Sequence, residues 1–252
     1  MAEIIILGAG WLGKPLCHYF EKKKYHVEGT SRSPSAEPFM KVFTLEGQQM
    51  VHDLTLADAY WVCAIPPRAS DPDSSYLAML DAALSLSNTM KCRGFLLCSS
   101  TGVYAEEDGR YDETGALAAP TSRRIQVLQE AEQKVLSSGG KVLRLAGLVG
   151  PQREPGQFVA GKVLRSSAQA LVNMVHRDDV IAAIDVVLSN WREARDIYNV
   201  CYPAHPTRFE YYQAHCGEKG TDMPEFMSQQ TQQRVIDGSA IEALGLRYAN
   251  SI

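Results

Sequence analysis

The sequence predicts an α/β fold with a doubly wound parallel sheet and a small C-terminal lobe. A β-branched apolar run at the N-terminus passes directly into a glycine-rich turn, and strand-like and helix-like segments then alternate as far as residue 150. The chain has 252 residues, 45% of them hydrophobic, which suffices to bury one sizeable core. Beyond Pro151 the pattern becomes irregular. We therefore predict one domain at residues 1–150 and a smaller lobe, interleaved with it, at residues 151–252.

The elements of the first domain follow in a regular order. A strand at residues 3–7 leads through the glycine turn into a helix at 12–24, and a second strand ends by Arg32. Repeated β-α alternation of this kind favours parallel strands, because each helix carries the chain back along the sheet. The remaining predicted elements are strands at 59–65, 94–99 and 141–147 and helices at 76–90 and 124–137.

Other stretches predict loops and the elements of the lobe. Residues 105–122 are rich in charge, glycine and proline, which is typical of an exposed loop that borders a ligand. An apolar run at 171–175 and a helix at 179–190 follow. A short glutamine cluster at 229–233 is interpreted as solvated surface.

Net charge, cysteine pattern and the N-terminal apolar run indicate the protein's partners and its compartment. The formal net charge is −4, so the chain offers no basic stripe for nucleic acid. Its six cysteines form no C-x-x-C pair and several lie in apolar runs, which favours buried free thiols in a reducing compartment. The N-terminal apolar run is too short for a signal sequence or a membrane span. We expect a cytoplasmic protein that binds neither nucleic acid nor membranes.

The glycine turn is the strongest functional signal, reading Gly8-Ala9-Gly10-Trp11-Leu12-Gly13. It fits G-x-G-x-x-G, and it stands between a predicted strand and a predicted helix, where a tight turn lets the backbone approach a pyrophosphate. The helix N-terminus adds unpaired N–H groups and partial positive charge. The turn predicts a Rossmann-type site for a nicotinamide coenzyme, with Trp11 and Leu12 included among its residues. The alternative is a turn that serves packing alone.

The end of the second predicted strand bears on which coenzyme binds. An acidic residue about 20 positions beyond the glycines would hold a ribose 2′-hydroxyl of NAD. The chain instead offers the hydroxyl of Ser31 and the guanidinium of Arg32, which suit a 2′-phosphate and favour NADP over NAD. Two alternatives stay open: Arg32 as a solvated loop residue, and Glu28 as the ribose ligand, which strand alternation makes less suitable.

Three later motifs, together with the glycine turn, resemble the extended short-chain dehydrogenase/reductase superfamily, the NAD(P)-dependent epimerases and dehydratases. These motifs begin at Ser99-Ser100-Thr101-Gly102-Val103-Tyr104, at Arg144 and at Asn173. The resemblance covers nearly the whole chain and implies that the C-terminal lobe lies on the substrate side. The triplet Ile65-Pro66-Pro67 departs from the usual pattern and is similar to the atypical epimerase-like branch.

The resemblance also implies individual contacts. Asp53, with Leu54 beside it, matches the aspartate that follows the third strand of the family fold and contacts adenine. Ser100 matches the active-site hydroxyl that polarises the substrate. The segment that lines the coenzyme after the fourth strand of the family fold is matched by Ala64, Ile65 and Pro66.

One departure from the family pattern concerns proton transfer. The family places Tyr-x-x-x-Lys in the helix after the long loop, where the tyrosine is the acid/base and the lysine lowers its pKa. Counted from Ser100 and anchored on Glu132, the tyrosine position falls on or near Arg124 and the lysine position near Leu128. Arginine stays protonated and leucine has no titratable group, so neither can transfer the proton.

Other residues are candidates for the chemistry of the site. Tyr104 and Tyr111 are the candidates for a substitute tyrosine from the loop side. Arg123 and Arg124 are candidates for binding a ligand phosphate or carboxylate, with a plain surface position as the alternative. Histidine and cysteine spacings predict no metal site, and no G-x-S-x-G pattern surrounds Ser100 to suggest acyl-enzyme chemistry.

Two hypotheses of function follow from these patterns. The first is an NAD(P)-dependent epimerase, dehydratase or reductase with non-standard proton transfer and an unknown small-molecule substrate. The second is a non-catalytic NAD(P) sensor or regulatory binding protein. Monomer and homodimer both stay open.

Overall fold

The computed structural model describes the chain except for residues 1, 48, 69–70, 72–73 and 232. The chain divides into two compact units, each made of discontinuous segments. Unit 1 comprises Met1–Val103, Ala119–Arg144 and Val187–Ile197, and unit 2 comprises Tyr104–Ala118, Leu145–Val186 and Tyr198–Ile252. Whether residues 1–150 and 151–252 form the two predicted domains stays a prediction.

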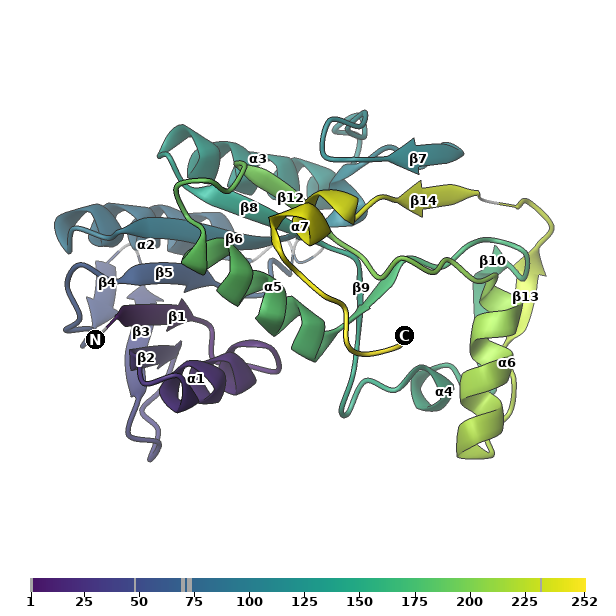
Figure 1. Cartoon of the computed structure of the whole chain (residues 1–252), viewed down its shortest axis with the longest axis horizontal. Coiled ribbons are helices and arrows are strands. Elements are labelled where there is room, and N and C mark those ends of the chain that lie inside the picture. The colour runs from purple at the N-terminus through teal and green to yellow at the C-terminus, as the bar shows by residue number, and fades with distance from the viewer. Residues whose placement is uncertain (1, 48, 69–70, 72–73, 232) are drawn as a thin grey trace. The chain divides into compact units, whose positions relative to one another are not determined.

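The main sheet has eight strands in the order β12-β8-β6-β5-β1-β2-β3-β4 (Figure 1). β1 pairs in parallel with β2 and β5, and β5 with β6, whereas β3 and β4 are antiparallel. The predicted doubly wound, mostly parallel sheet is therefore confirmed. Its strands are β1 Glu3–Leu7, β2 His26–Ser31, β3 Met40–Glu46, β4 Gln49–His52, β5 Tyr60–Cys63, β6 Gly94–Ser100, β8 Lys141–Leu145 and β12 Ile197–Val200.

Three helices cover the sheet within unit 1: α1 Gly13–Lys22, α2 Tyr76–Thr89 and α3 Arg123–Ser137. Alternation along β1 assigns them to faces, because Ile5 and Leu7 belong to a core cluster with residues of α2 and α3. Ile6 points to the other face, where α1 lies (Figure 1). Both faces of β1 are thus buried, which is why this strand is apolar throughout.

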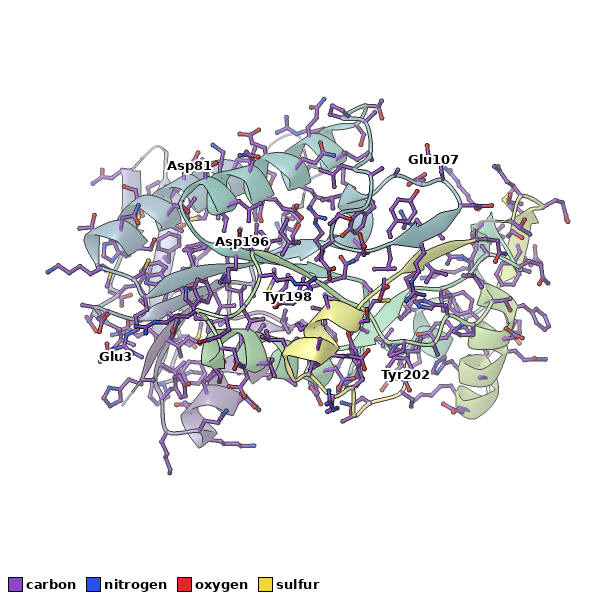
Figure 2. All side chains as sticks on the ribbon, turned by 45° about the horizontal axis from the view of Figure 1, so that its top comes forward. Glu3, Asp81, Glu107, Asp196, Tyr198 and Tyr202 are labelled. Atoms are coloured by element: carbon purple, nitrogen blue, oxygen red, sulfur yellow. The ribbon has the colours of Figure 1, made fainter. Side chains whose placement is uncertain are left out.

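The outer surfaces of the helices are charged. Lys134 on α3 pairs with Asp81 on α2 at 3.0 Å, and Asp81 points away from the sheet (Figure 2). None of the helices in the described part of the chain is long and apolar enough to cross a membrane. All six cysteines are free thiols, and five of them are buried.

Unit 2 contains three small parallel sheets of two strands each, β10-β13, β11-β9 and β14-β7. Its apolar cluster gathers around Tyr211 and Tyr212 of α6. The bounds are β7 Gly109–Tyr111, β9 Gly147–Val149, α4 Pro155–Phe158, β10 Val163–Ser167, β11 Met174–His176, α6 Arg208–Lys219, β13 Glu225–Ser228, β14 Arg234–Ile236 and α7 Ser239–Leu244; α5 Arg177–Ser189 begins in unit 2 and ends in unit 1.

The structure corrects the sequence interpretation at several elements. The segment predicted as a loop at 105–122 contains β7, whose three residues pair with β14 more than a hundred positions later. The strand predicted at 141–147 is two strands, β8 and β9. Helix α6 is a further difference, because no helix is predicted there although Thr207 and Glu210 form a capping box that marks its start.

Candidate functional site

The glycine turn between β1 and α1 has a geometry that other residues cannot adopt. Gly8 has a φ of 85°, in the left-handed region, and a β-carbon there would lie 2.9 Å from Cγ1 of Ile65. At Gly13 a β-carbon would lie 2.2 Å from the carbonyl oxygen of Gly8. Gly10 differs, because nothing lies within 4 Å of the place where its β-carbon would be. The turn therefore requires glycine at positions 8 and 13, whereas Gly10 faces open space.

Thr30, at the end of β2, fixes the turn from the side. The N–H of Gly8 donates to Oγ1 of Thr30 at 3.0 Å, and the N–H of Ala9 donates to the Thr30 carbonyl at 2.8 Å. Thr30 is buried. The sequence analysis did not single out this threonine, because its role depends on a contact 22 positions away.

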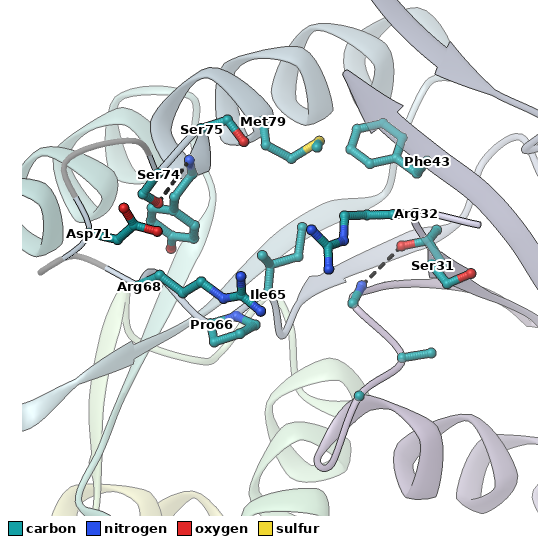
Figure 3. Close-up of a pocket in the computed structure, with 15 residues that line it drawn as sticks. Ser31, Arg32, Phe43, Ile65, Pro66, Arg68, Asp71, Ser74, Ser75 and Met79 are labelled. Carbon is teal, nitrogen blue, oxygen red and sulfur yellow. Dashed lines mark hydrogen bonds between the residues drawn. The ribbon is translucent and has the colours of Figure 1, made fainter. Parts of the chain in front are cut away.

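The turn opens onto a cavity of about 420 Å³ within unit 1 (Figure 3). One wall is apolar, formed by Phe43 of β3, Met79 of α2 and the side chain of Ile65. The residues predicted to bind coenzyme that line it are Gly8, Gly10, Ser31, Arg32, Ile65 and Pro66. Residues that the sequence analysis did not assign include Thr30, Phe43, Arg68, Asp71, Ser74, Ser75, Tyr76 and Met79.

The polar part of the cavity consists mainly of hydroxyls and two guanidinium groups. Ser74 donates its hydroxyl to the Pro67 carbonyl at 3.0 Å, and Ser31 donates to the carbonyl of Ser33. Burial raises the pKa of Tyr76, so its phenol stays protonated at physiological pH. Arg32 and Arg68 bring the positive charge. Asp71 adds one carboxylate to the lining. A cavity with a glycine turn at a helix N-terminus, an apolar wall and two guanidinium groups against one carboxylate suits an anionic ligand that carries a flat ring.

The other predicted coenzyme residues lie outside the lining of this cavity. Asp53 accepts a hydrogen bond at Oδ1 from the N–H of Val42 at 2.5 Å. The N–H of Ala64 donates to the Leu7 carbonyl at 2.9 Å and so ties the end of β5 to β1. The predicted coenzyme contacts of these residues stay predictions, as do those of Trp11, Leu12 and Leu54.

Glu28, the alternative ribose ligand, has a structural role. Its buried carboxylate accepts hydrogen bonds from the N–H of Thr55 at 3.0 Å, from Oγ1 of Thr55 at 2.6 Å and from the N–H of Leu56 at 3.3 Å. It does not line the cavity. Ser31 and Arg32, at the end of β2 and just after it, do line the cavity.

Ser100 ends β6, beside Arg124. Its Oγ accepts a hydrogen bond from the N–H of Gly102 at 3.1 Å. A β-carbon on Gly102 would lie 3.3 Å from this Oγ and 3.0 Å from Nη2 of Arg124, so the hydroxyl and the guanidinium both lie next to this glycine. Leu128, one helical turn later, is buried. That Arg124 and Leu128 occupy the tyrosine and lysine positions of the family motif stays a prediction.

A buried ion pair holds the strand end that carries Ser100. Ser99 donates to Oε1 of Glu132 at 2.6 Å, and Arg144 donates to both carboxylate oxygens of Glu132, with Nη2 at 2.8 Å from Oε2. All three residues are buried. The network joins β6, α3 and β8, and bidentate geometry makes it well defined. Ser122 caps the start of α3 by accepting from the N–H of Ile125.

The two loop tyrosines donate their phenol protons elsewhere in unit 2. Tyr104 is fully buried, and its hydroxyl donates to Oδ1 of Asn199 at 2.8 Å. Tyr111 donates to the carbonyl of Glu107 at 3.1 Å. Among the described residues, no group of three or more His, Cys, Asp or Glu side chains is arranged to hold a metal ion.

Comparison with known proteins identifies the family. The sequence profile of the NAD dependent epimerase/dehydratase family matches residues 4–201. The chain belongs to this family. A relative, Protein YeeZ of Escherichia coli (strain K12), is 32% identical over 266 residues, which cover 98% of this chain and 96% of that protein.

Solved structures of low identity share the epimerase/dehydratase fold. MoeE5 in complex with UDP-glucose and NAD superposes with a TM-score of 0.80 at 17% identity, covering 100% of this chain and 95% of that one. UDP-glucuronic acid 4-epimerase from Bacillus cereus, in complex with UDP-glucuronic acid and NAD, gives 0.75 at 16% identity, covering 99% and 94%. These likenesses confirm the predicted Rossmann-type fold.

Proposed function

We propose that unit 1 binds a nicotinamide coenzyme in the cavity at the glycine turn, with NADP preferred over NAD. The observation that carries the proposal is that the turn, Ser31 and Arg32 line one cavity. The open side of Gly10 and the N-terminus of α1 suit a pyrophosphate. Phe43 and Met79 offer an apolar wall for the adenine, and the Arg32 guanidinium suits a 2′-phosphate.

We further propose an epimerase-, dehydratase- or reductase-like reaction on an unknown small molecule. A bound nicotinamide supplies hydride transfer. Ser100 donates or accepts a hydrogen bond at the substrate oxygen, and Arg124 beside it stabilises negative charge. Because Arg124 and Leu128 take the places of the tyrosine and lysine, the proton at that oxygen is exchanged by another group or by water.

A non-catalytic NAD(P) sensor or regulatory protein is the second candidate. Arg124 and Leu128 favour the sensor, since a guanidinium cannot act as the acid/base of the family. If the purified protein turns over a substrate and Ser100→Ala abolishes this turnover, the result supports the enzyme. If the protein binds coenzyme and a partner responds to that binding even in Ser100→Ala, the result supports the sensor. For either role we propose a cytoplasmic protein, monomeric or homodimeric, that binds neither nucleic acid nor membranes.

The first test is titration with NADPH and NADH, following the fluorescence of the reduced coenzyme. We expect saturable binding of both, tighter for NADPH, and loss of both in Gly10→Asp, whose carboxylate would face the pyrophosphate. Gly10→Ala is the matched control, because a β-carbon there meets no atom within 4 Å. Absence of binding by the folded wild-type protein would overturn the proposal. A preference for NADH would overturn the assignment of Ser31 and Arg32.

A further inference from the structure

The cavity contains a second cation that the glycine-turn pattern does not explain. Arg68 lies in the loop after β5, on the wall opposite Arg32, and the two guanidinium groups extend into the cavity toward one another (Figure 3). Among the ion pairs of the described residues, neither arginine has a carboxylate partner. The carboxylate of Asp71 lies on the Ser74 side, and the Arg68 guanidinium is directed away from it (Figure 3).

Two converging guanidinium groups indicate an anionic occupant. Like charges that face one another in a partly enclosed space repel, and a polyanion between them removes this cost. Each guanidinium presents a planar fork of donors that matches phosphate oxygens in a bidentate manner. Backbone N–H groups alone would suffice for a weaker phosphate site at the turn.

The position of the β5 loop indicates which phosphate Arg68 meets. A β-carbon on Gly8 would lie 2.9 Å from Cγ1 and 3.0 Å from Cα of Ile65, so this loop abuts the glycine turn. Arg68 follows three residues later, and its carbonyl accepts from the N–H of Asp71 at 2.8 Å. Arg32, in contrast, follows Ser31 at the end of β2, where the ribose of a dinucleotide lies.

We propose that Arg68 is a positioning residue for the coenzyme pyrophosphate, which it binds from the loop after β5, beside the glycine turn. The inference rests on the proposed coenzyme site and assigns separate tasks to the two arginines. Arg68 recognises the diphosphate that NAD and NADP share, and Arg32 recognises the 2′-phosphate that NADP alone carries. Together they bind the dinucleotide at two points and fix its direction along the cavity.

Coenzyme fragments separate these tasks in a calorimetric titration. The probes are AMP, ADP and adenosine 2′,5′-bisphosphate, followed by NADH and NADPH. For Arg68→Ala we expect the affinity for ADP, NADH and NADPH to fall about tenfold, since a charge-assisted hydrogen bond is lost. The affinities for AMP and the 2′,5′-bisphosphate should stay within about twofold of wild type.

Arg32→Ala is the matched control from the same cavity. It should weaken the 2′,5′-bisphosphate and NADPH about tenfold and leave ADP and NADH unchanged. Arg68→Lys should recover part of the ADP affinity, because it keeps the charge without the fork. Both arginines are exposed, so unchanged thermal unfolding verifies that each variant is folded.

Each other outcome overturns the assignment. If Arg68→Ala weakens the 2′,5′-bisphosphate and spares ADP, then Arg68 binds the 2′-phosphate. If it changes no affinity, then Arg68 is a solvated loop residue. Failure of the proposed function is distinguishable, because the wild-type protein would then bind none of the fragments or coenzymes, and the inference about Arg68 would fall with it.

Discussion

The glycine turn and the Ser100 end of β6 belong to the same unit but relate differently to the family pattern. At the turn, Gly8 and Gly13 lie where a β-carbon would clash, and Gly8 and Gly10 line one cavity together with two guanidinium groups. At the Ser100 end, the count from Ser100 and Glu132 predicts Arg124 and Leu128 at the positions of the family's proton-transfer pair. Because the fold does not decide the chemistry of a site, the reaction at Ser100 has to be tested separately from the proposed coenzyme site.

The largest effect should come from breaking the ion pair under Ser100. Glu132→Ala leaves the Arg144 guanidinium buried without its partner and Ser99 without its acceptor. We expect a loss of about 3–5 kcal/mol in the free energy of unfolding, measured by urea denaturation. Glu130→Ala is the control on the same helix, because the exposed pair of Glu130 with Lys134 should contribute less than about 1 kcal/mol. Equal losses in the two variants would show that the buried ion pair contributes no more to stability than the exposed pair does.

A smaller effect should separate the glycines of the turn. Gly13→Ala places a β-carbon 2.2 Å from a backbone oxygen, so the start of α1 must shift. We expect unfolding to become easier by about 1–3 kcal/mol and coenzyme affinity to fall. Gly10→Ala is the control, because nothing lies within 4 Å of the place where its β-carbon would be. It should change the unfolding free energy by no more than about 0.5 kcal/mol. If Gly13→Ala is as stable as Gly10→Ala and still binds coenzyme, then the turn does not require glycine at position 13.

The smallest effect is a pH dependence that sharpens the role of Arg32. Burial raises the pKa of Tyr76, so this phenol in the cavity does not titrate between about pH 5.5 and 8. A phosphate monoester loses its second proton near pH 6, so the 2′-phosphate gains negative charge as pH rises. We expect the affinity ratio of NADP⁺ to NAD⁺, measured by calorimetry, to rise severalfold over this range. A constant ratio contradicts a contact between Arg32 and the 2′-phosphate.

The sequence by itself determined the features that depend on neighbouring residues. The order of strand, glycine turn and helix from Glu3 to Lys22 follows from hydrophobic period and turn chemistry, and so does the place of Ser31 and Arg32 at a strand end. Such patterns are readable because backbone geometry fixes which positions share a face over a few residues.

Only the tertiary structure decided which distant groups meet. It directed Glu28 toward Thr55, joined β7 to β14, and brought the guanidinium of Arg68 opposite that of Arg32. None of these pairs is close in sequence, and none has a local pattern that predicts it. Their positions follow from burial and hydrogen bonding across the whole fold, which select one arrangement among many that the same local preferences allow.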